Sequence, residues 1–246
     1  MTREQGASAR VSVVVGASGG CGASLVCGAV ALAWARGGAA TWLVELDPDR
    51  GDLADAWAVA PARTLADLVS VADEMDALHV RQAAHEHPSG VMALMAPAEP
   101  GCGIEWSAPR AARLASAAAA AAGPDGRVVI DAGSGLGALA AAVIGRAATA
   151  LVVCGPSLAS CRRARRIVEA LSAARGDEGR CGLVVSRGPG GGEIGTRALG
   201  RAVGAEILAE LPWSEREAAA IGAGRWPGAG RRGLARALQD LAGAVA

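Results

Sequence analysis

The sequence contains no Tyr, no Phe and no Lys, so all 24 of its basic residues are Arg. These balance 24 acidic residues, and the formal net charge is zero. A chain without net charge has no overall field that attracts nucleic acid or anionic membranes, so any such contact must be local. With 52% apolar and 20% charged residues, the 246-residue chain has the composition of a globular protein and not of a disordered one.

The cysteines lack the Cys-x-x-Cys spacing of redox and zinc motifs and lie in apolar or Gly-rich runs. This pattern favours reduced, buried thiols, typical of a cytosolic protein, over a disulfide framework. The cysteines are Cys21, Cys27, Cys102, Cys154, Cys161 and Cys181.

One long uncharged run, from Val11 to Ala35, has the length of a membrane span. Glycine interrupts it at Gly16, Gly19, Gly20 and Gly22. Each glycine would cost a continuous helix about 1 kcal/mol relative to Ala. The run therefore predicts a strand, a Gly-rich loop and a helix, and we expect a cytoplasmic protein.

Short β-branched runs alternate with longer Ala- and Leu-rich stretches, which predicts an α/β fold with a doubly wound, mostly parallel sheet. We expect one domain over residues 10–246 after a disordered tail of residues 1–9. The predicted strands are Val11–Val15, Trp42–Leu46, Val91–Met95, Arg127–Asp131, Ala150–Cys154, Cys181–Val185 and Glu206–Leu211. The clearest predicted helices are Ser24–Arg36, Pro109–Ala122, Leu158–Ala174 and Gly233–Ala246.

The strongest motif is the Gly-rich stretch Val13–Ser24, where a strand runs through a loop into a helix. Such a loop directs backbone N–H groups inward, and the helix dipole adds to them, so phosphate binds without a charged side chain. Ser24 could place its hydroxyl on Mg²⁺. A tight turn without a ligand is the alternative interpretation.

Two further strands end in carboxylates, in Leu43–Asp47 and Arg127–Asp131. Acids at the carboxyl ends of parallel strands face the ligand crevice of an open α/β sheet. Asp131 has the position of a metal-coordinating Walker B acid.

Together these motifs resemble the MinD/ParA-type P-loop ATPases of the SIMIBI class, which carry a deviant Walker A loop, and most of all their TadZ/CpaE-like branch. The resemblance spans about residues 10–246. It also rests on Leu46-Asp47, Gly51–Leu53, Thr64–Leu68, Gly90–Pro97, Asp131–Gly133, Pro156 with Arg162 and Arg166, Ser186-Arg187 and Leu211-Pro212.

The resemblance implies that ATP or ADP binds with Mg²⁺. Asp47 in switch I would be the catalytic residue, and Ser24, Asp47 and Asp131 would bind the metal. The positions that match the nucleotide-binding residues are Ser18, Gly19, Gly20, Cys21, Gly22, Ala23, Ser24, Leu25, Ser186, Arg187 and Pro212.

Two departures from the family pattern bear on activity. Ser18 and Ala23 stand where the family has lysines, of which the first reaches across a dimer and the second pairs with the β- and γ-phosphates. Losing both contacts would weaken nucleotide binding by a factor of about 10² to 10⁴. Hydrolysis also loses a cation that acts on the transferring phosphoryl group, which typically raises the rate by a factor of about 10³ to 10⁵. Arg50 and Arg187 are the candidate substitutes for it.

The resemblance implies a dimeric positioning or assembly factor for Tad/Flp pilus or type II/IV secretion machinery or for the septum site, recruited to the inner face of the membrane or the cell pole. We expect weak nucleotide binding and negligible hydrolysis. One alternative is a ParA-like, DNA-associating ATPase that hydrolyses ATP, and another is a nucleotide-free scaffold. A nitrogenase iron protein is excluded because Ala132–Leu136 lacks cysteine, and a Rossmann dehydrogenase fits only Gly20–Gly22 with Glu45.

Three further features have simple structural interpretations. Four arginines within Arg162–Arg166 suit DNA phosphates, but a solvated helix face is the favoured interpretation. Leu234, Leu238, Leu241 and Val245 form an apolar stripe that suits a helix docked on the sheet better than a membrane-binding tail. His85–His87 is interpreted as a surface loop without a metal.

Overall fold

The computed structural model describes residues 9–99, 106–175, 179–190, 192, 194–228 and 230–246. Cys102, Gly191 and residues 1–8 of the predicted tail lie outside the described residues, and Ala9 is buried.

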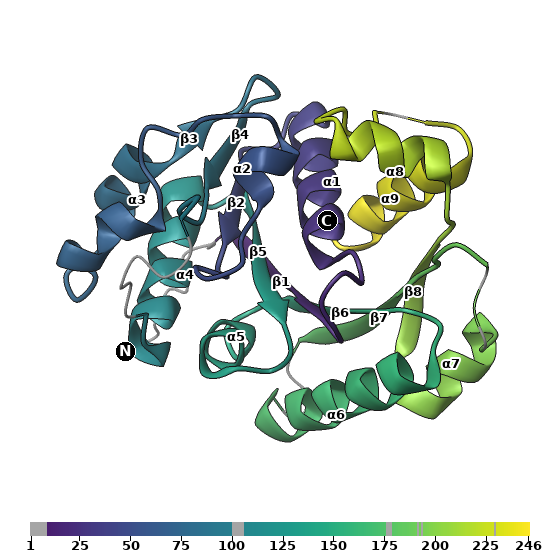
Figure 1. Ribbon diagram of the computed structural model, residues 1–246. Coiled ribbons are helices and arrows are strands. Elements are labelled where there is room, and N and C mark those ends of the chain that lie inside the picture. The colour runs from purple at the N-terminus through teal and green to yellow at the C-terminus, as the bar shows by residue number, and fades with distance from the viewer. Residues whose placement is uncertain (1–8, 100–105, 176–178, 191, 193, 229) are drawn as a thin grey trace.

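Eight strands form one sheet in the order β3-β4-β2-β5-β1-β6-β7-β8 (Figure 1). Neighbouring strands are parallel except β3 and β4. β1 lies at the centre, and the chain leaves it first toward β2 and later toward β6, so the fold has its ligand crevice at the carboxyl end of β1. The strands are β1 (Arg10–Gly16), β2 (Thr41–Glu45), β3 (His85–Glu86), β4 (Val91–Leu94), β5 (Arg127–Ser134), β6 (Thr149–Cys154), β7 (Arg180–Ser186) and β8 (Glu206–Leu211).

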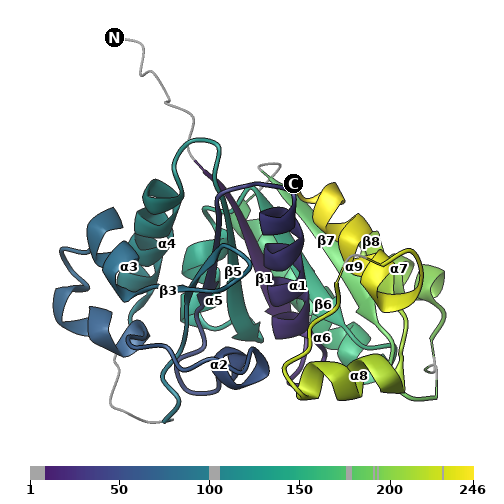
Figure 2. The ribbon, with the colours of Figure 1, turned by 90° about the horizontal axis from the view of Figure 1, so that it is seen from above.

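Helices cover both faces of the sheet, and Figure 2 shows them from above. The helices are α1 (Ala23–Arg36), α2 (Leu53–Ala56), the 3₁₀ helix η1 (Leu65–Val71), α3 (Ala77–Ala83), α4 (Ala108–Ala122), α5 (Ala138–Ile144), α6 (Leu158–Arg175), α7 (Thr196–Val203), α8 (Glu215–Gly222) and α9 (Gly233–Ala244).

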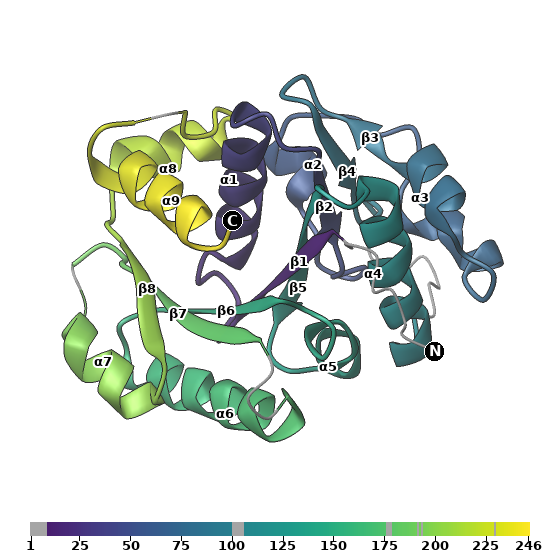
Figure 3. The same cartoon turned by 180° about the vertical axis from the view of Figure 1, so that it is seen from behind.

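The core consists of two apolar layers, one on each face of the sheet. One layer joins α1, α2 and α9 to one face of the sheet, and the other joins η1, α3, α4, α5, α6 and α7 to the opposite face (Figure 3). Val13 and Val15 of β1 point into the second layer and Val14 points into the first. The alternation explains why the central strands are apolar throughout, as parallel strands buried on both faces are.

The predicted strands and helices are all present, with ends that match or differ by at most three residues. The Ala run 117–122 lies in α4, which Ser107 caps by accepting a hydrogen bond from the Arg110 N–H. The prediction of a loop at His85–His87 is wrong, because His85 and Glu86 form β3 antiparallel to β4. Cys27, Cys154 and Cys161 are buried free thiols as predicted, whereas Cys21 and Cys181 are half-buried.

The C-terminal helix α9 docks beside α1 and β8, which confirms the expected role of its apolar stripe. Leu234, Leu238, Leu241 and Val245 are all buried. The carbonyl groups at its end have protein donors, since Trp34, Arg180 and Arg10 donate to the Ala242, Ala244 and Ala246 oxygens at 2.8–2.9 Å. Within the described residues, no helix combines the length and the apolar composition that crossing a bilayer requires.

A buried carboxylate ties three elements together at the carboxyl edge of the sheet. Glu45, at the end of β2, is 1% exposed and accepts hydrogen bonds from the Leu53 and Ala96 N–H groups, both at 2.9 Å. Burial raises the pKa of Glu45 from 4.5 to about 7. A Cβ at Gly51 would lie 2.7 Å from the Glu45 carboxyl carbon. Because any side chain would clash there, the close approach of the backbone to this carboxylate requires glycine.

Leu241→Ala should lower the free energy of unfolding by about 2–4 kcal/mol, because it leaves a cavity between α9 and α1. Gln239→Ala, on the exposed side of the same helix, should change it by less than about 0.5 kcal/mol. Urea unfolding of both variants measures the difference. Equal effects would contradict the docking of this helix through its apolar stripe.

Glu45 should make the protein less stable as the pH rises from 5 to 8. Its pKa is higher in the folded than in the unfolded chain, so the folded state binds the proton more tightly, and stability falls by up to about 3 kcal/mol across this window. Glu45→Gln, which mimics the protonated form, should flatten the profile. Denaturant unfolding at several pH values tests this, and an unchanged slope in the variant would contradict it.

Candidate nucleotide-binding site

The Gly-rich loop lies between the carboxyl end of β1 and the first residue of α1. It is fixed at its base, because the Ala17 N–H donates to the Val153 oxygen and the Gly135 N–H donates to the Gly16 oxygen, both at 2.8 Å. Gly20 and Gly22 have φ of 71° and 93°, a left-handed conformation that side chains disfavour. The turn therefore requires glycine at these two positions.

The loop leaves the first turn of α1 open to an anion. Gly22 is the N-cap residue and supplies no side-chain hydrogen bond to the helix. The first N–H groups of a helix have no partner within it, and the helix dipole adds positive potential there. This backbone geometry suits a phosphate group.

A cavity of about 430 Å³ opens above this helix end. Residues 18–25 of the loop form its floor, and Asp47, Arg50, Asp52, Ser134 and Trp226 contribute to its walls. Of the described residues that line it, Arg50 is the only basic one. The structure therefore places the loop residues predicted to bind nucleotide, from Ser18 to Leu25, in one concave site.

Of the predicted metal-binding residues, Ser24 and Asp47 line this cavity, and Asp131 is buried behind Ser24. Asp131, within β5 and 3% exposed, accepts a hydrogen bond from the Gly133 N–H at 3.0 Å and lies beside the Ser24 hydroxyl, which partly offsets the rise in its pKa that burial causes. Asp47 lies so close to Gly133 that a Cβ there would overlap its carboxylate. Burial raises the pKa of both aspartates, and Arg50 opposes the rise at Asp47.

These residues would hold magnesium only together with a ligand. In the part of the chain that the structure describes, no group of three or more His, Cys, Asp or Glu side chains could hold a metal ion. Mg²⁺ in nucleotide sites is commonly bound by one or two carboxylates plus phosphate oxygens. Ser24, Asp47 and Asp131 fit that arrangement.

Glu45 departs from the expectation that carboxylates at strand ends face the crevice. Its two oxygens accept the Leu53 and Ala96 N–H groups instead, and it does not line the cavity. Asp47, two residues further along, does line it. Alternation along a strand would place residues 45 and 47 on the same face, so it does not explain the difference, and Asp47 already lies beyond the end of β2.

A second cavity of about 400 Å³ adjoins the first across the same loop. Ser186, Arg187 and Pro212, the other residues predicted to bind nucleotide, line it together with residues 18–22. The Ser186 hydroxyl lies 3.4 Å from where a Gly22 Cβ would be, so β7 closes directly on the loop. These three residues and the loop therefore form one continuous surface.

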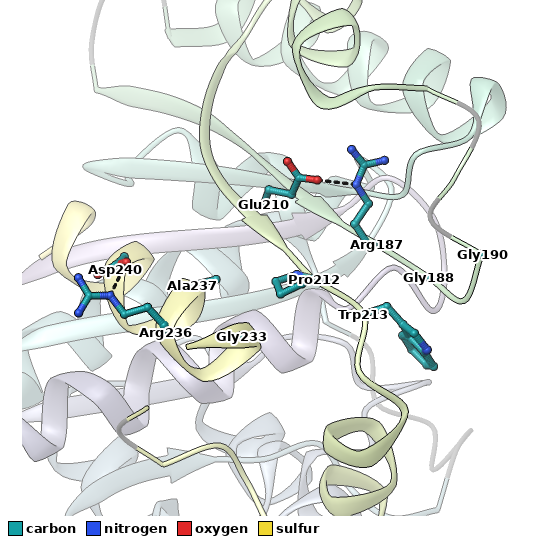
Figure 4. A pocket seen from close by; sticks show the side chains of 10 residues that line it. All are labelled: Arg187, Gly188, Gly190, Glu210, Pro212, Trp213, Gly233, Arg236, Ala237 and Asp240. Atoms are coloured by element: carbon teal, nitrogen blue, oxygen red, sulfur yellow. Dashed lines mark hydrogen bonds and ion pairs between the residues drawn. The ribbon is translucent and has the colours of Figure 1, made fainter. Parts of the chain in front are cut away.

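Arg187 lines this second cavity, but its guanidinium is bound elsewhere. It donates to Glu210 at 2.7 Å, to the Ile194 oxygen at 3.1 Å and to the Thr196 hydroxyl. Figure 4 shows it turned toward Glu210, while the Trp213 indole, 47% exposed, projects outward. The wider depression drawn there, of about 910 Å³, continues past Pro212 to an Arg236–Asp240 ion pair on α9.

Sequence reasoning missed the contribution of the C-terminal segment to this site. Trp226, which follows α8, donates its indole N–H to the Ala56 backbone oxygen at 2.7 Å. It also lines the 430 Å³ cavity above the start of α1, which we call the phosphate-side cavity. It lies over Gly28 of α1, where a Cβ would meet its ring at 2.4 Å, and makes an edge contact with Trp57 at 5.9 Å. A lone Trp between two short helices carries no periodic signal, so only the fold brings it here.

The arginines Arg162, Arg163, Arg165 and Arg166 are all exposed on α6. Arg165 forms an i,i+4 ion pair with Glu169 at 2.7 Å, which suits a solvated helix face.

Comparison with known proteins finds similar structures but no similar sequence among protein families or curated proteins. No protein-family model and no curated protein sequence matches the chain. Among solved structures, a ParA-family ATPase from Chlorobium tepidum TLS superposes with a TM-score of 0.77 at 22% identity, covering 95% of this chain and 97% of that one. The septum site-determining protein MinD from Pyrococcus horikoshii OT3, complexed with Mg-ADP, gives 0.80 at 19% identity and covers 96% of each chain.

The same fold also occurs in an enzyme of a different kind. Cobyrinic acid a,c-diamide synthase from Mycobacterium smegmatis, with bound ADP and magnesium, gives a TM-score of 0.67 at 17% identity and covers 96% of this chain and 94% of that one. At such identities the likeness shows the fold and not the activity. The chain therefore has the doubly wound α/β fold of the MinD/ParA P-loop ATPases.

Proposed function

We propose that this protein is a MinD/ParA-like positioning or assembly factor that binds ATP or ADP with Mg²⁺ weakly and hydrolyses ATP negligibly. The observation that carries the proposal is the backbone phosphate cradle at the start of α1, flanked by Asp47 and Asp131 but neutral at Ser18 and Ala23. The MinD and cobyrinic acid a,c-diamide synthase structures, of like fold, hold ADP and magnesium.

Each residue of the site has a role that follows from its position. The N–H groups of residues 19–24 would bind phosphate oxygens, and Ser24 and Asp47, with Asp131 beside Ser24, would hold the metal. Magnesium would supply charge neutralisation at the phosphates. Ser186 and Pro212 border the space for the base, beside the outward-facing Trp213.

Slow turnover follows from the missing charge. A cation that acts on the transferring phosphoryl group contributes about 10³ to 10⁵ in rate, and neither Ser18 nor Ala23 supplies one. A protein that binds nucleotide but turns it over slowly suits recruitment of a partner better than a motor. In the finer proposal, which rests on the TadZ/CpaE-like motifs, a homodimer recruits Tad/Flp pilus, type II/IV secretion or septum-site proteins at the membrane or cell pole.

Two functions of other kinds remain as alternatives. The exposed arginines of α6 would serve DNA association in a hydrolysing ParA-like protein, and a gel shift abolished by salt would support that function. Loss of nucleotide binding altogether would leave a scaffold.

Calorimetric titration with Mg·ADP and Mg·ATP, with light scattering on the same samples, tests the proposal. We expect dissociation constants from about 10 μM to the millimolar range, because the lost lysine contacts weaken binding about 10² to 10⁴-fold. Ala23→Lys should tighten binding about 10- to 100-fold by restoring one charge-assisted contact. Ala40→Lys, which adds the same charge at an exposed position beyond the far end of α1, should leave it unchanged.

Rapid ATP turnover by the wild-type protein would contradict the proposal of negligible hydrolysis. Absence of binding in both the wild type and Ala23→Lys would contradict a nucleotide site altogether and favour the scaffold.

A further inference from the structure

The phosphate-side cavity has an unbalanced set of charges. Asp47 and Asp52 line it, and the buried Asp131 lies behind Ser24. A nucleoside diphosphate adds further negative charge, which three carboxylates in a partly dehydrated site would repel. The backbone cradle supplies only partial charges, so a side-chain cation would strengthen binding.

Arg50 is the basic side chain in position to supply it. It lies on the turn after Asp47. In this turn the backbone N–H groups of Arg50 and Gly51 donate to the backbone carbonyl oxygen of Asp47 at 3.2 and 2.8 Å. Its side chain is 63% exposed and lines the same cavity as Ala23 and Ser24. The guanidinium spans the mouth of the site, donating to both Asp47 oxygens at 3.3 Å and to the Ser134 hydroxyl at 3.2 Å.

Arg187, the other candidate, already donates hydrogen bonds within the protein. Its side chain is 15% exposed and donates to Glu210, Thr196 and the Ile194 oxygen, so turning it toward the loop would break all three contacts. The Arg50 contacts are long and exposed, and an exposed ion pair contributes little to stability. Arg50 can therefore leave its partners at small cost and Arg187 cannot.

We infer that Arg50 takes the place of the missing lysines as the phosphate-binding cation of this site. Without a ligand, its guanidinium forms an ion pair with Asp47. The inference rests on the proposed nucleotide site. When Asp47 binds the metal, its oxygens are no longer available to Arg50, and the guanidinium turns to the phosphates. Its planar N–H donors suit bidentate phosphate binding.

Calorimetry with Mg·ADP tests the inference. Arg50→Ala should weaken binding about 10- to 100-fold, which is the effect of losing a charge-assisted contact. Arg36→Ala removes the same charge at the exposed far end of α1 and should have no effect. In an Ala23→Lys background the effect of Arg50→Ala should fall below about threefold, because the new lysine supplies the charge. Thermal unfolding verifies that the variants fold.

ADP in EDTA provides a second test that a general loss of stability would not reproduce. Without metal, Asp47 holds Arg50 in the wild type, so Asp47→Asn should tighten ADP binding by releasing it. Adding Arg50→Ala to that variant should remove the gain. If the wild type binds Mg·ADP and Arg50→Ala binds it equally well, the inference is wrong while the proposed function stands. If the wild type does not bind Mg·ADP at all, both are wrong.

Discussion

The turn from β1 into α1 is the constraint on which the site depends. Gly20 and Gly22 hold left-handed conformations there, and they let the loop fold back above the end of the central strand. This geometry leaves the N-terminus of α1 uncapped and facing a cavity. A helix end in that position would normally acquire a side-chain cap, so its open state is consistent with an anion as the missing partner.

Charge around this cradle is arranged in an unusual way. Glu45, Asp47 and Asp131 lie near the carboxyl edge of β2 and β5, and both oxygens of Glu45 accept backbone N–H groups, from Leu53 and Ala96. Its role is to join β2, β4 and the start of α2, which sets the path of the segment that carries Asp47 and Arg50. In the proposed site, the cation that faces the nucleotide comes from the turn that carries Arg50 and not from the Gly-rich loop, and ligand binding would replace the Arg50–Asp47 ion pair.

Much of the fold follows from the sequence because buried parallel strands and Gly-rich turns have strong local signals. The run of β-branched residues predicts the strand Val11–Val15, and the spacing of glycines predicts the loop to Ser24. The predictions missed β3, since two residues at a sheet edge have no period to detect, and the expected orientation of Glu45 was wrong because its partners, Leu53 and Ala96, come from other elements. Trp226 reaches the cavity through a contact 170 residues away, with Ala56, that no local pattern encodes.

Amide chemical shifts of the isotope-labelled protein, followed during a titration with Mg·ADP, test most directly that the backbone of the loop binds phosphate. We expect saturable shifts of the amides between Gly19 and Ser24, with the Arg50 side-chain signal moving at the same nucleotide concentration. Unchanged loop amides at millimolar Mg·ADP would contradict the account and show that the turn is a structural element without a ligand.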